Sequence, residues 1–122
     1  MRCMLTPNSR PPDHNVQGAE AARHGTPLAA TSFQVIPEGK DTPVDVIVVY
    51  WIHISDEGHI YRSHSSDGGA KWTSKELESI SKPSPETLAV APNKKLKVNA
   101  LVFTAENGDT EAFSDEWRDF SL

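Results

Sequence analysis

Apolar and polar residues follow a pattern along this chain that favours strands over helices. The clearest segment is residues 44–54, VDVIVVYWIHI, whose β-branched and aromatic residues are typical of a buried strand. A turn at residues 56–58 (DEG) separates it from a second strand at residues 59–65. Residues 67–69 (DGG) form the next turn, and Trp72 follows. This order of strands and turns predicts a β-meander.

The C-terminal half carries a second and weaker meander. Strands are predicted at residues 87–91, 97–104 and 110–114. Between the last two, Asn107-Gly108 is a strong hairpin signal, because both residues tolerate positive φ. A type I′ turn requires positive φ at both central positions, so the pair predicts a hairpin turn of that type.

The two meanders share landmarks in the same order, which indicates an internal repeat. The corresponding pairs are residues 28–30 (LAA) with 88–90 (LAV), Gly58 with Gly108, and Trp72 with Trp117. The spacing between partners falls along the chain, so the extra residues of the first copy lie in its turns. The alternative is that any two β-meanders share such features.

The repeat gives the chain a simple organisation. Residues 1–26 carry proline and glycine among polar residues without an apolar period, and they predict a disordered tail. Residues 27–122 predict one β domain, with unit one at 27–82 and unit two at 83–122. Residues 73–82 are predicted as a long loop, with a strand ending at Leu77 as the alternative.

Composition excludes several kinds of function. The net charge is −5, from 12 basic and 17 acidic residues, which argues against nucleic-acid binding. The single cysteine, Cys3, lies in the predicted tail and allows no intramolecular disulfide. The histidines show no metal-ligand spacing, and no pair of carboxylates stands out as a glycosidase requires. We therefore expect no metal, no cofactor and no catalytic residue, and the chain is predicted not to be an enzyme.

The N-terminus lacks the apolar region of a signal peptide, and no apolar run has the length of a membrane span. A cytoplasmic protein, or one secreted by an unconventional route, is therefore expected.

Units of this size, with three or four short antiparallel strands, are typical of propeller blades. The chain resembles the fungal fucose-specific lectins, which are six-bladed β-propellers, and their two-blade bacterial relatives. The segments that carry the resemblance are residues 25–30 (GTPLAA), 55–60 (SDEGHI) and Trp72 in the first unit, and residues 87–89 (TLA), 106–108 (ENG) and Trp117 in the second. The resemblance implies an all-β fold of two propeller-like blades. It also implies a non-catalytic, lectin-like module that binds fucosylated glycans between blades.

Members of that family hold fucose with an Arg from the second strand, a Glu from the third strand, and aromatic rings. The second-strand place falls near Ile47 in unit one, where there is no Arg, and on Lys97 in unit two. The third-strand place falls near Arg62 in unit one and near Ala112 in unit two, with Glu111 one position away.

The predicted ligand-binding residues are therefore Arg62, Glu111, Trp72 and Trp117. Arg62 would donate to the sugar hydroxyls, Glu111 would accept from them, and the two tryptophans would cover the apolar C–H patch of the sugar. In the alternative, both tryptophans are core anchors, and Arg62 and Glu111 are solvated charges. The first interpretation predicts that replacing Arg62 or Glu111 with Ala abolishes glycan binding with little change in melting temperature.

Residues 65–72, SSDGGAKW, match the Asp-box S-x-D-x-G-x-T-W of sialidase-like propellers, with Lys71 in place of Thr. In those folds the box is a structural hairpin, so it favours a blade without favouring hydrolysis. An ordinary Asp-Gly hairpin ahead of a packing Trp explains the same residues. Two further functions stay open: a protein-interaction module built on an incomplete or degenerate propeller, and a piece of a sialidase-like propeller.

Two blades alone leave sheet faces and strand edges exposed, and repeat folds need neighbours to cover them. We therefore expect a homo-oligomer, in which three copies could close a six-bladed ring, or a fragment of a larger propeller.

Overall fold

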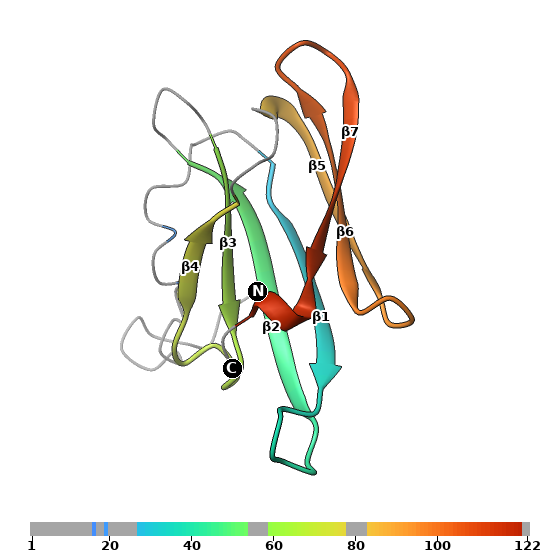
Figure 1. Cartoon of the computed structure of the whole chain (residues 1–122). Coiled ribbons are helices and arrows are strands. Elements are labelled where there is room, and N and C mark those ends of the chain that lie inside the picture. Colours follow the sequence, from blue (N-terminus) through green and yellow to red (C-terminus); the bar gives the residue numbers. More distant parts are fainter. Residues whose placement is uncertain (1–15, 17–18, 20–26, 54–58, 78–82, 121–122) are drawn as a thin grey trace, which may run out of the picture.

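The computed structural model describes residues 16, 19, 27–53, 59–77 and 83–120. Over these residues the chain is all-β, which confirms the predicted fold class (Figure 1). The predicted tail, apart from Val16 and Ala19, and the predicted turn at residues 56–58 lie outside the described residues.

Two antiparallel meanders make up the fold (Figure 1). Sheet one contains four strands, which are β1 (Ala29–Val35), β2 (Val44–Ile52), β3 (Ile60–Ser65) and β4 (Thr73–Glu76). Sheet two contains β5 (Pro83–Asn93), β6 (Val98–Ala105) and β7 (Thr110–Glu116), and a short 3-10 turn, η1 (Trp117–Asp119), follows it. Within each sheet, every strand pairs with the next one in the sequence, as expected of two blade-like units.

Burial alternates along β2 as far as Tyr50. In this part of the strand, Val46, Val48 and Tyr50 are fully buried, while Ile47 and Val49 between them are half-buried. Trp51, which follows on the opposite side, is buried as well, at 1% exposed. We call the side of sheet one that carries Val46, Val48 and Tyr50 its front face, and the opposite side its back face. Because side chains alternate along a strand, the pairing register places Arg62 on the front face as the partner of Tyr50.

Sheet two packs against the front face of sheet one. We call the side of sheet two that carries Leu101 and Phe103 of β6, which point into the shared core, its back face. The opposite side, on which Val102 is 41% exposed, is its front face. The first strands, β1 and β5, lie next to each other, and the third strands are joined by an ion pair between Arg62 and Asp115. The middle strands β2 and β6 also run in the same direction (Figure 1). The second unit therefore repeats the orientation of the first, front to back.

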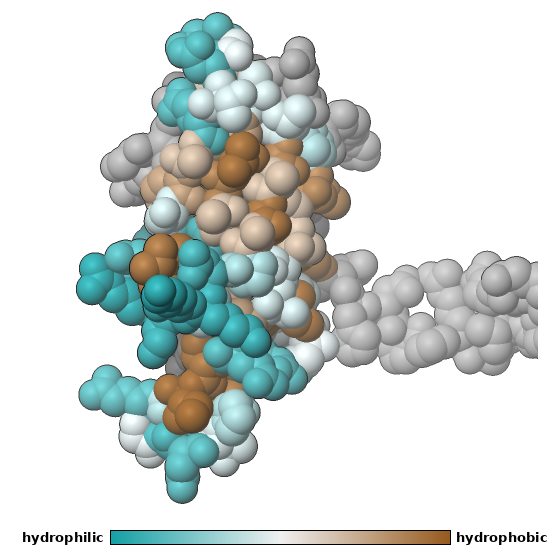
Figure 2. All heavy atoms as spheres, turned by 90° about the vertical axis from the view of Figure 1, so that its right-hand side faces the viewer, coloured by the Kyte–Doolittle hydropathy of each residue, from teal (hydrophilic) through white to brown (hydrophobic). Residues whose placement is uncertain are grey.

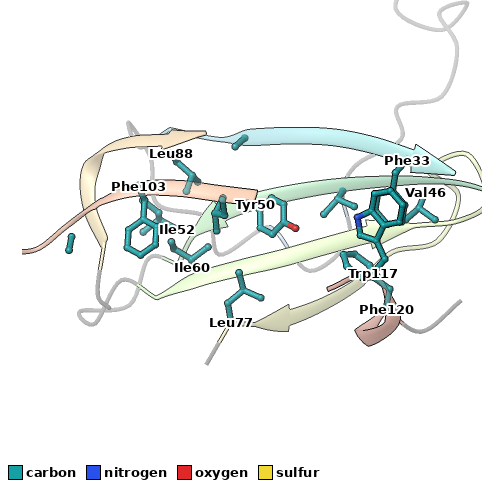
Figure 3. Close-up of a cluster of buried hydrophobic side chains, with 14 residues drawn as sticks. Phe33, Val46, Tyr50, Ile52, Ile60, Leu77, Leu88, Phe103, Trp117 and Phe120 are labelled. Atoms are coloured by element: carbon teal, nitrogen blue, oxygen red, sulfur yellow. The ribbon is translucent and has the colours of Figure 1, made fainter. Parts of the chain in front are cut away.

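One hydrophobic cluster spans both sheets (Figure 3). At one end the Trp117 ring stacks on Phe33, with ring centroids 4.1 Å apart, and Phe120 meets Phe33 edge-on at 5.5 Å. At the other end Phe103 and Leu88 lie close to Ile52 and Ile60 in the view of Figure 3, all of them in the same cluster. The last residues of the chain thereby close the core of sheet one.

The structure corrects one turn prediction and decides another segment. The Asn107-Gly108 hairpin is confirmed, but type I′ is wrong, because Lys97 is the only non-glycine residue with positive φ in the described part of the chain. Gly108 alone adopts positive φ, at 94°, and its N–H donates to the Ala105 carbonyl at 2.9 Å. Asn107 instead uses its side chain, whose Oδ1 accepts from the Asp109 N–H at 3.0 Å. In the segment 73–82, the predicted loop is wrong over residues 73–76, which form β4 and confirm the alternative of a short strand. Residues 78–82 lie outside the described residues.

Candidate functional site

Arg62 lies at the centre of a buried polar network between the two sheets. It projects from the front face of β3, is only 2% exposed, and donates from Nη1 to Asp115 Oδ1 at 2.6 Å. Its Nη2 donates to the Asp119 carbonyl at 3.5 Å, and its guanidinium carbon lies 3.9 Å from the centre of the Phe120 ring. Arg62 is therefore neither a solvated charge nor a residue open to a ligand.

The network continues through three further buried side chains. The Tyr50 hydroxyl donates to Asp115 Oδ2 at 2.5 Å, and Asn99 Nδ2 donates to the Tyr50 oxygen at 3.1 Å. Trp117 Nε1 in turn donates to Asn99 Oδ1 at 2.9 Å. These contacts join strands of both sheets and η1, so the network fixes how the two units sit on each other.

Burial controls the protonation of this network. Loss of water raises the pKa of the Asp115 carboxyl above its ordinary value, although the hydrogen bond from Tyr50 and the charge of Arg62 act in the opposite direction. Burial, followed by the charge of Asp115, raises the pKa of Tyr50, so its hydroxyl stays a donor. Nε of Arg62 is buried without a hydrogen-bond partner among the described residues. The network is therefore better suited to holding the two sheets together than to binding a ligand.

A groove lies at one end of the sheets, and residues of both units line it. It has a volume of about 920 Å³. Its lining comes from the end of β1 and the loop after it, from the β5–β6 turn, and from the end of β7 and η1. The lining residues are Gln34, Val35, Ile36, Pro37, Glu38, Leu96, Lys97, Glu116, Trp117, Arg118 and Phe120.

The groove combines apolar walls with charged groups. Ile36 is 61% exposed on the side of unit one, and Leu96 is 67% exposed on the side of unit two. An exposed ion pair joins Arg118 Nε to Glu116 Oε2 at 2.9 Å. Lys97 has a φ of 55°, and its carbonyl accepts from the Trp117 N–H at 3.0 Å. Ligand sites in proteins likewise combine apolar surface with a few polar groups.

The structure separates the four residues that the sequence selects for ligand binding. Trp117 lines the groove, but it is 6% exposed and belongs to the core cluster. Arg62 belongs to the buried network, and Glu111 is half-buried on β7, opposite Phe103. Trp72 is half-buried and donates to the Gly69 carbonyl at 2.9 Å. Arg62 and Trp117 are linked through the polar network, whereas Trp72 and Glu111 are neither groove-lining nor part of that network.

The sequence alone does not predict the groove. Gln34, Glu38 and Arg118 lie in or beside connecting segments, and only the stacking of the units brings them together. Lys97 is the exception, since the repeat already aligns it with a sugar-binding Arg of the resembled lectins.

The turn in residues 65–72 is held by its own polar side chains. Ser65 Oγ accepts from the Gly69 N–H at 2.9 Å and donates to Asp67 Oδ1 at 2.8 Å. The Lys71 N–H also donates to Asp67 Oδ1, at 2.9 Å. This bond from Lys71, with the bond from Ser65, lowers the pKa of the Asp67 carboxyl. The turn is thus a self-contained structural element, and its relation to the Asp-box stays a prediction.

The described residues contain no group of three or more His, Cys, Asp or Glu side chains placed to hold a metal ion. No helix among them is long and apolar enough to span a membrane.

Comparison of the chain with protein-family models, with curated proteins and with solved structures gave no match.

Proposed function

We propose that this chain is a non-catalytic, carbohydrate-binding module of the fucose-lectin type, with its site in the groove between the two units. The observation that carries the proposal is the groove itself, to which both units contribute apolar and hydrogen-bonding side chains. The resemblance of the sequence to lectins that bind sugar between blades supports the same location.

The chemistry of the groove suits a monosaccharide at the end of a glycan. Ile36 and Leu96 offer apolar surface for the C–H patch of a sugar ring. Arg118 and Lys97 supply donors for hydroxyl oxygens, and Glu38 supplies an acceptor for hydroxyl protons. Charged partners make stronger hydrogen bonds than neutral ones, which helps to replace the water that a sugar loses on binding.

The test is a glycan array that includes fucosylated glycans, probed with the purified full chain. We expect binding to fucosylated glycans, and we expect Arg118→Ala and Glu38→Ala to reduce it at least tenfold. Both side chains are exposed, so neither change should alter the fold. Lys94→Ala is the matched control, because Lys94 is exposed in the β5–β6 turn but does not line the groove.

The same array tests the site that the sequence predicts. Loss of binding in Glu111→Ala, with retention in Arg118→Ala and Glu38→Ala, would move the site from the groove to β7. Absence of wild-type binding to any fucosylated glycan would exclude the fucose-lectin function.

A second candidate is a protein-interaction module that works as part of a homo-oligomer or of a larger propeller. It is favoured by one observation, which is the exposed apolar front face of sheet two. The two functions are compatible, since the groove and this face are different surfaces of the molecule. Measurement of mass in solution, without any sugar, tests the second function separately.

A further inference from the structure

Sheet two has one strand fewer than sheet one in the described part of the chain. In sheet one, β4 pairs with the outer side of β3, whereas no described strand pairs with the outer side of β7 in sheet two. After β7 the chain turns away through η1, and Trp117 packs on Phe33 of sheet one. Among the described residues, β7 is therefore an open edge strand at the place where β3 has β4.

The backbone of β7 directs every second residue toward this edge. In an antiparallel pair, a residue directs its N–H and its C=O to the same side, and the side alternates along the strand. Before β7, the Asp109 carbonyl accepts from the Ala105 N–H at 2.7 Å. After β7, the Trp117 N–H donates to the Lys97 carbonyl at 3.0 Å. The odd-numbered residues thus bond to β6, and the residues whose backbone groups point outward are Thr110, Ala112, Ser114 and Glu116.

The repeat relates the positions of the two sheets, since it aligns Ala29 with Ala89. Pairing then aligns two rows of residues, which are Ala29, Tyr50 and Arg62 across sheet one and Ala89, Val102 and Ala112 across sheet two. Ala112 of β7 therefore corresponds to Arg62 of β3.

β3 uses these same positions to hold β4. The Leu77 N–H donates to the Ile60 carbonyl at 2.9 Å. Ile60 and every second residue after it, Arg62 included, therefore direct their backbone groups to β4. The outward groups of β7 thus have the spacing and the direction that hold a fourth strand in sheet one.

The other sheet edges are protected in ways that β7 is not. β4 has only four residues, β5 carries Pro92 and a register shift, and β1 lies beside β5. Short strands, proline and irregular register are devices that prevent unwanted pairing at sheet edges. β7 has seven residues in continuous register and contains neither proline nor glycine. An open edge of this kind can accept an extended peptide as an additional strand.

The side chains of β7 leave its edge accessible. Thr110, Ala112 and Ser114 are small and exposed on the front face of sheet two. Figure 2 looks onto this side of the molecule, where apolar residues gather. On the opposite side of β7, Phe113 is half-buried and packs against the core cluster. A strand on this edge would cover more of Phe113 and remove apolar surface from water.

The charges of β7 determine which kind of strand fits. Its charged residues are Glu111, Asp115 and Glu116, all of them negative. Asp115 is buried with Arg62, whereas Glu111 and Glu116 are half-buried. A second copy of β7 would bring further carboxylates to the same sheet, and like charges on neighbouring strands are unfavourable. A strand that carries Lys or Arg is favoured instead.

We propose that the outer edge of β7 binds an extended, basic segment of a different protein, which joins sheet two as a fourth strand antiparallel to β7. The segment carries Lys or Arg opposite Glu111 and, two residues earlier, an apolar side chain opposite Phe113. The edge shares only Glu116 with the groove, so the proposal does not depend on sugar binding.

The test is fluorescence anisotropy of a labelled peptide titrated with the full chain. The peptide has the length of β7 and the sequence Thr-Ser-Thr-Val-Thr-Lys-Thr, which places Val opposite Phe113 and Lys opposite Glu111. We expect saturable binding. The same peptide with Glu in place of Lys should bind at least tenfold more weakly. So should a peptide that is N-methylated at the residue opposite Ala112, because it lacks the N–H that donates to the Ala112 carbonyl.

Variants of the protein test the edge from the other side. Ala112→Pro removes an outward N–H, and an edge strand tolerates proline where the missing N–H faces outward. The variant should therefore fold, as circular dichroism will verify, and bind the basic peptide at least tenfold more weakly. Ser114→Pro is a second variant of the same design. Ala112→Ser keeps the N–H and is the matched control, which should bind as the wild type does.

Three results would overturn the proposal: no binding of the basic peptide, equal binding of the Glu peptide, or equal binding of the N-methylated peptide. Light scattering tests the other occupant. An assembled wild type that becomes monomeric in Ala112→Pro would show that a second copy occupies the edge, and a basic partner would then be wrong. Glu38→Ala changes the groove alone, so it should keep peptide binding even if it loses glycan binding.

Discussion

Asp115 accepts hydrogen bonds from two side chains of the opposite sheet, Arg62 and Tyr50. A buried carboxylate without such donors is strongly unfavourable, because it has lost its water. The buried ion pair between Arg62 and Asp115 therefore adds little net stability by its attraction. Removal of one partner, however, carries a large free-energy penalty. For this reason Arg62 is expected to affect stability, contrary to the small effect that the sequence alone suggests.

Arg62→Ala should lower the free energy of unfolding by about 3–5 kcal/mol, because it leaves Asp115 buried and unpaired. Urea unfolding of the purified variant measures the loss. The matched control is Arg118→Ala, which breaks an exposed ion pair with Glu116 and should cost about 1 kcal/mol or less. Equal effects of the two changes would contradict the buried role of Arg62.

The pH dependence of stability should report on Asp115. Its pKa is raised in the folded state, so its stabilising contribution is complete below the unfolded pKa of about 3.9 and falls as pH rises through the folded pKa. The stability of the wild type relative to Asp115→Asn, which does not titrate, should therefore increase as the pH falls from neutral into this range. Urea unfolding across pH measures it, and a difference that moves the other way would contradict the raised pKa.

Individual strands and turns are the level at which the sequence is most informative. The apolar run at residues 44–54 predicts β2 because its β-branched and aromatic residues favour a buried strand. The Asn107-Gly108 pair predicts the hairpin but not the turn type, since Asn107 can satisfy the backbone with its side chain instead of adopting positive φ.

Gly108→Ala should lower the free energy of unfolding by about 1–2 kcal/mol, the cost of a left-handed conformation for a residue with a Cβ. No atom lies within 4 Å of the added Cβ, so backbone strain is the only source of the loss. Chemical denaturation measures it. Gly108→Asn should cost less, because Asn adopts positive φ more readily, and an Asn variant as unstable as the Ala variant would contradict this account.

The sequence pattern of β7 does not identify the carboxylate that pairs with Arg62. Glu111, Phe113 and Asp115 alternate along β7 and all face the same side of sheet two. The two-residue period therefore cannot tell which carboxylate meets Arg62. That choice depends on how far the sheets are shifted along each other, which only the three-dimensional packing of the two sheets determines. The groove is unpredictable for the same reason, because its walls come from loops of separate units.

At the scale of the whole molecule, the two sheets share a hydrophobic core in the described part of the chain, so they should unfold together. Leu101→Ala in β6 should cost about 2–5 kcal/mol, since Leu101 is fully buried. Native-state hydrogen exchange should then show the same loss of protection in β2 of the other sheet. Leu96→Ala, at an exposed site, serves as the control. Unchanged protection of β2 in Leu101→Ala would mean that the units fold independently.

The contrast between the two front faces has a thermal consequence. Within the chain, Tyr50 and Arg62 are held by polar groups of sheet two, whereas Val102 and Ala112 at the corresponding places offer apolar contact alone. Apolar association weakens on cooling, because its driving force near room temperature is largely entropic. In a homo-oligomer held by the front face of sheet two, as the second proposed function has it, chilling should therefore release separate copies of the chain, while the two sheets inside each copy stay joined by their charged and hydrogen-bonded side chains.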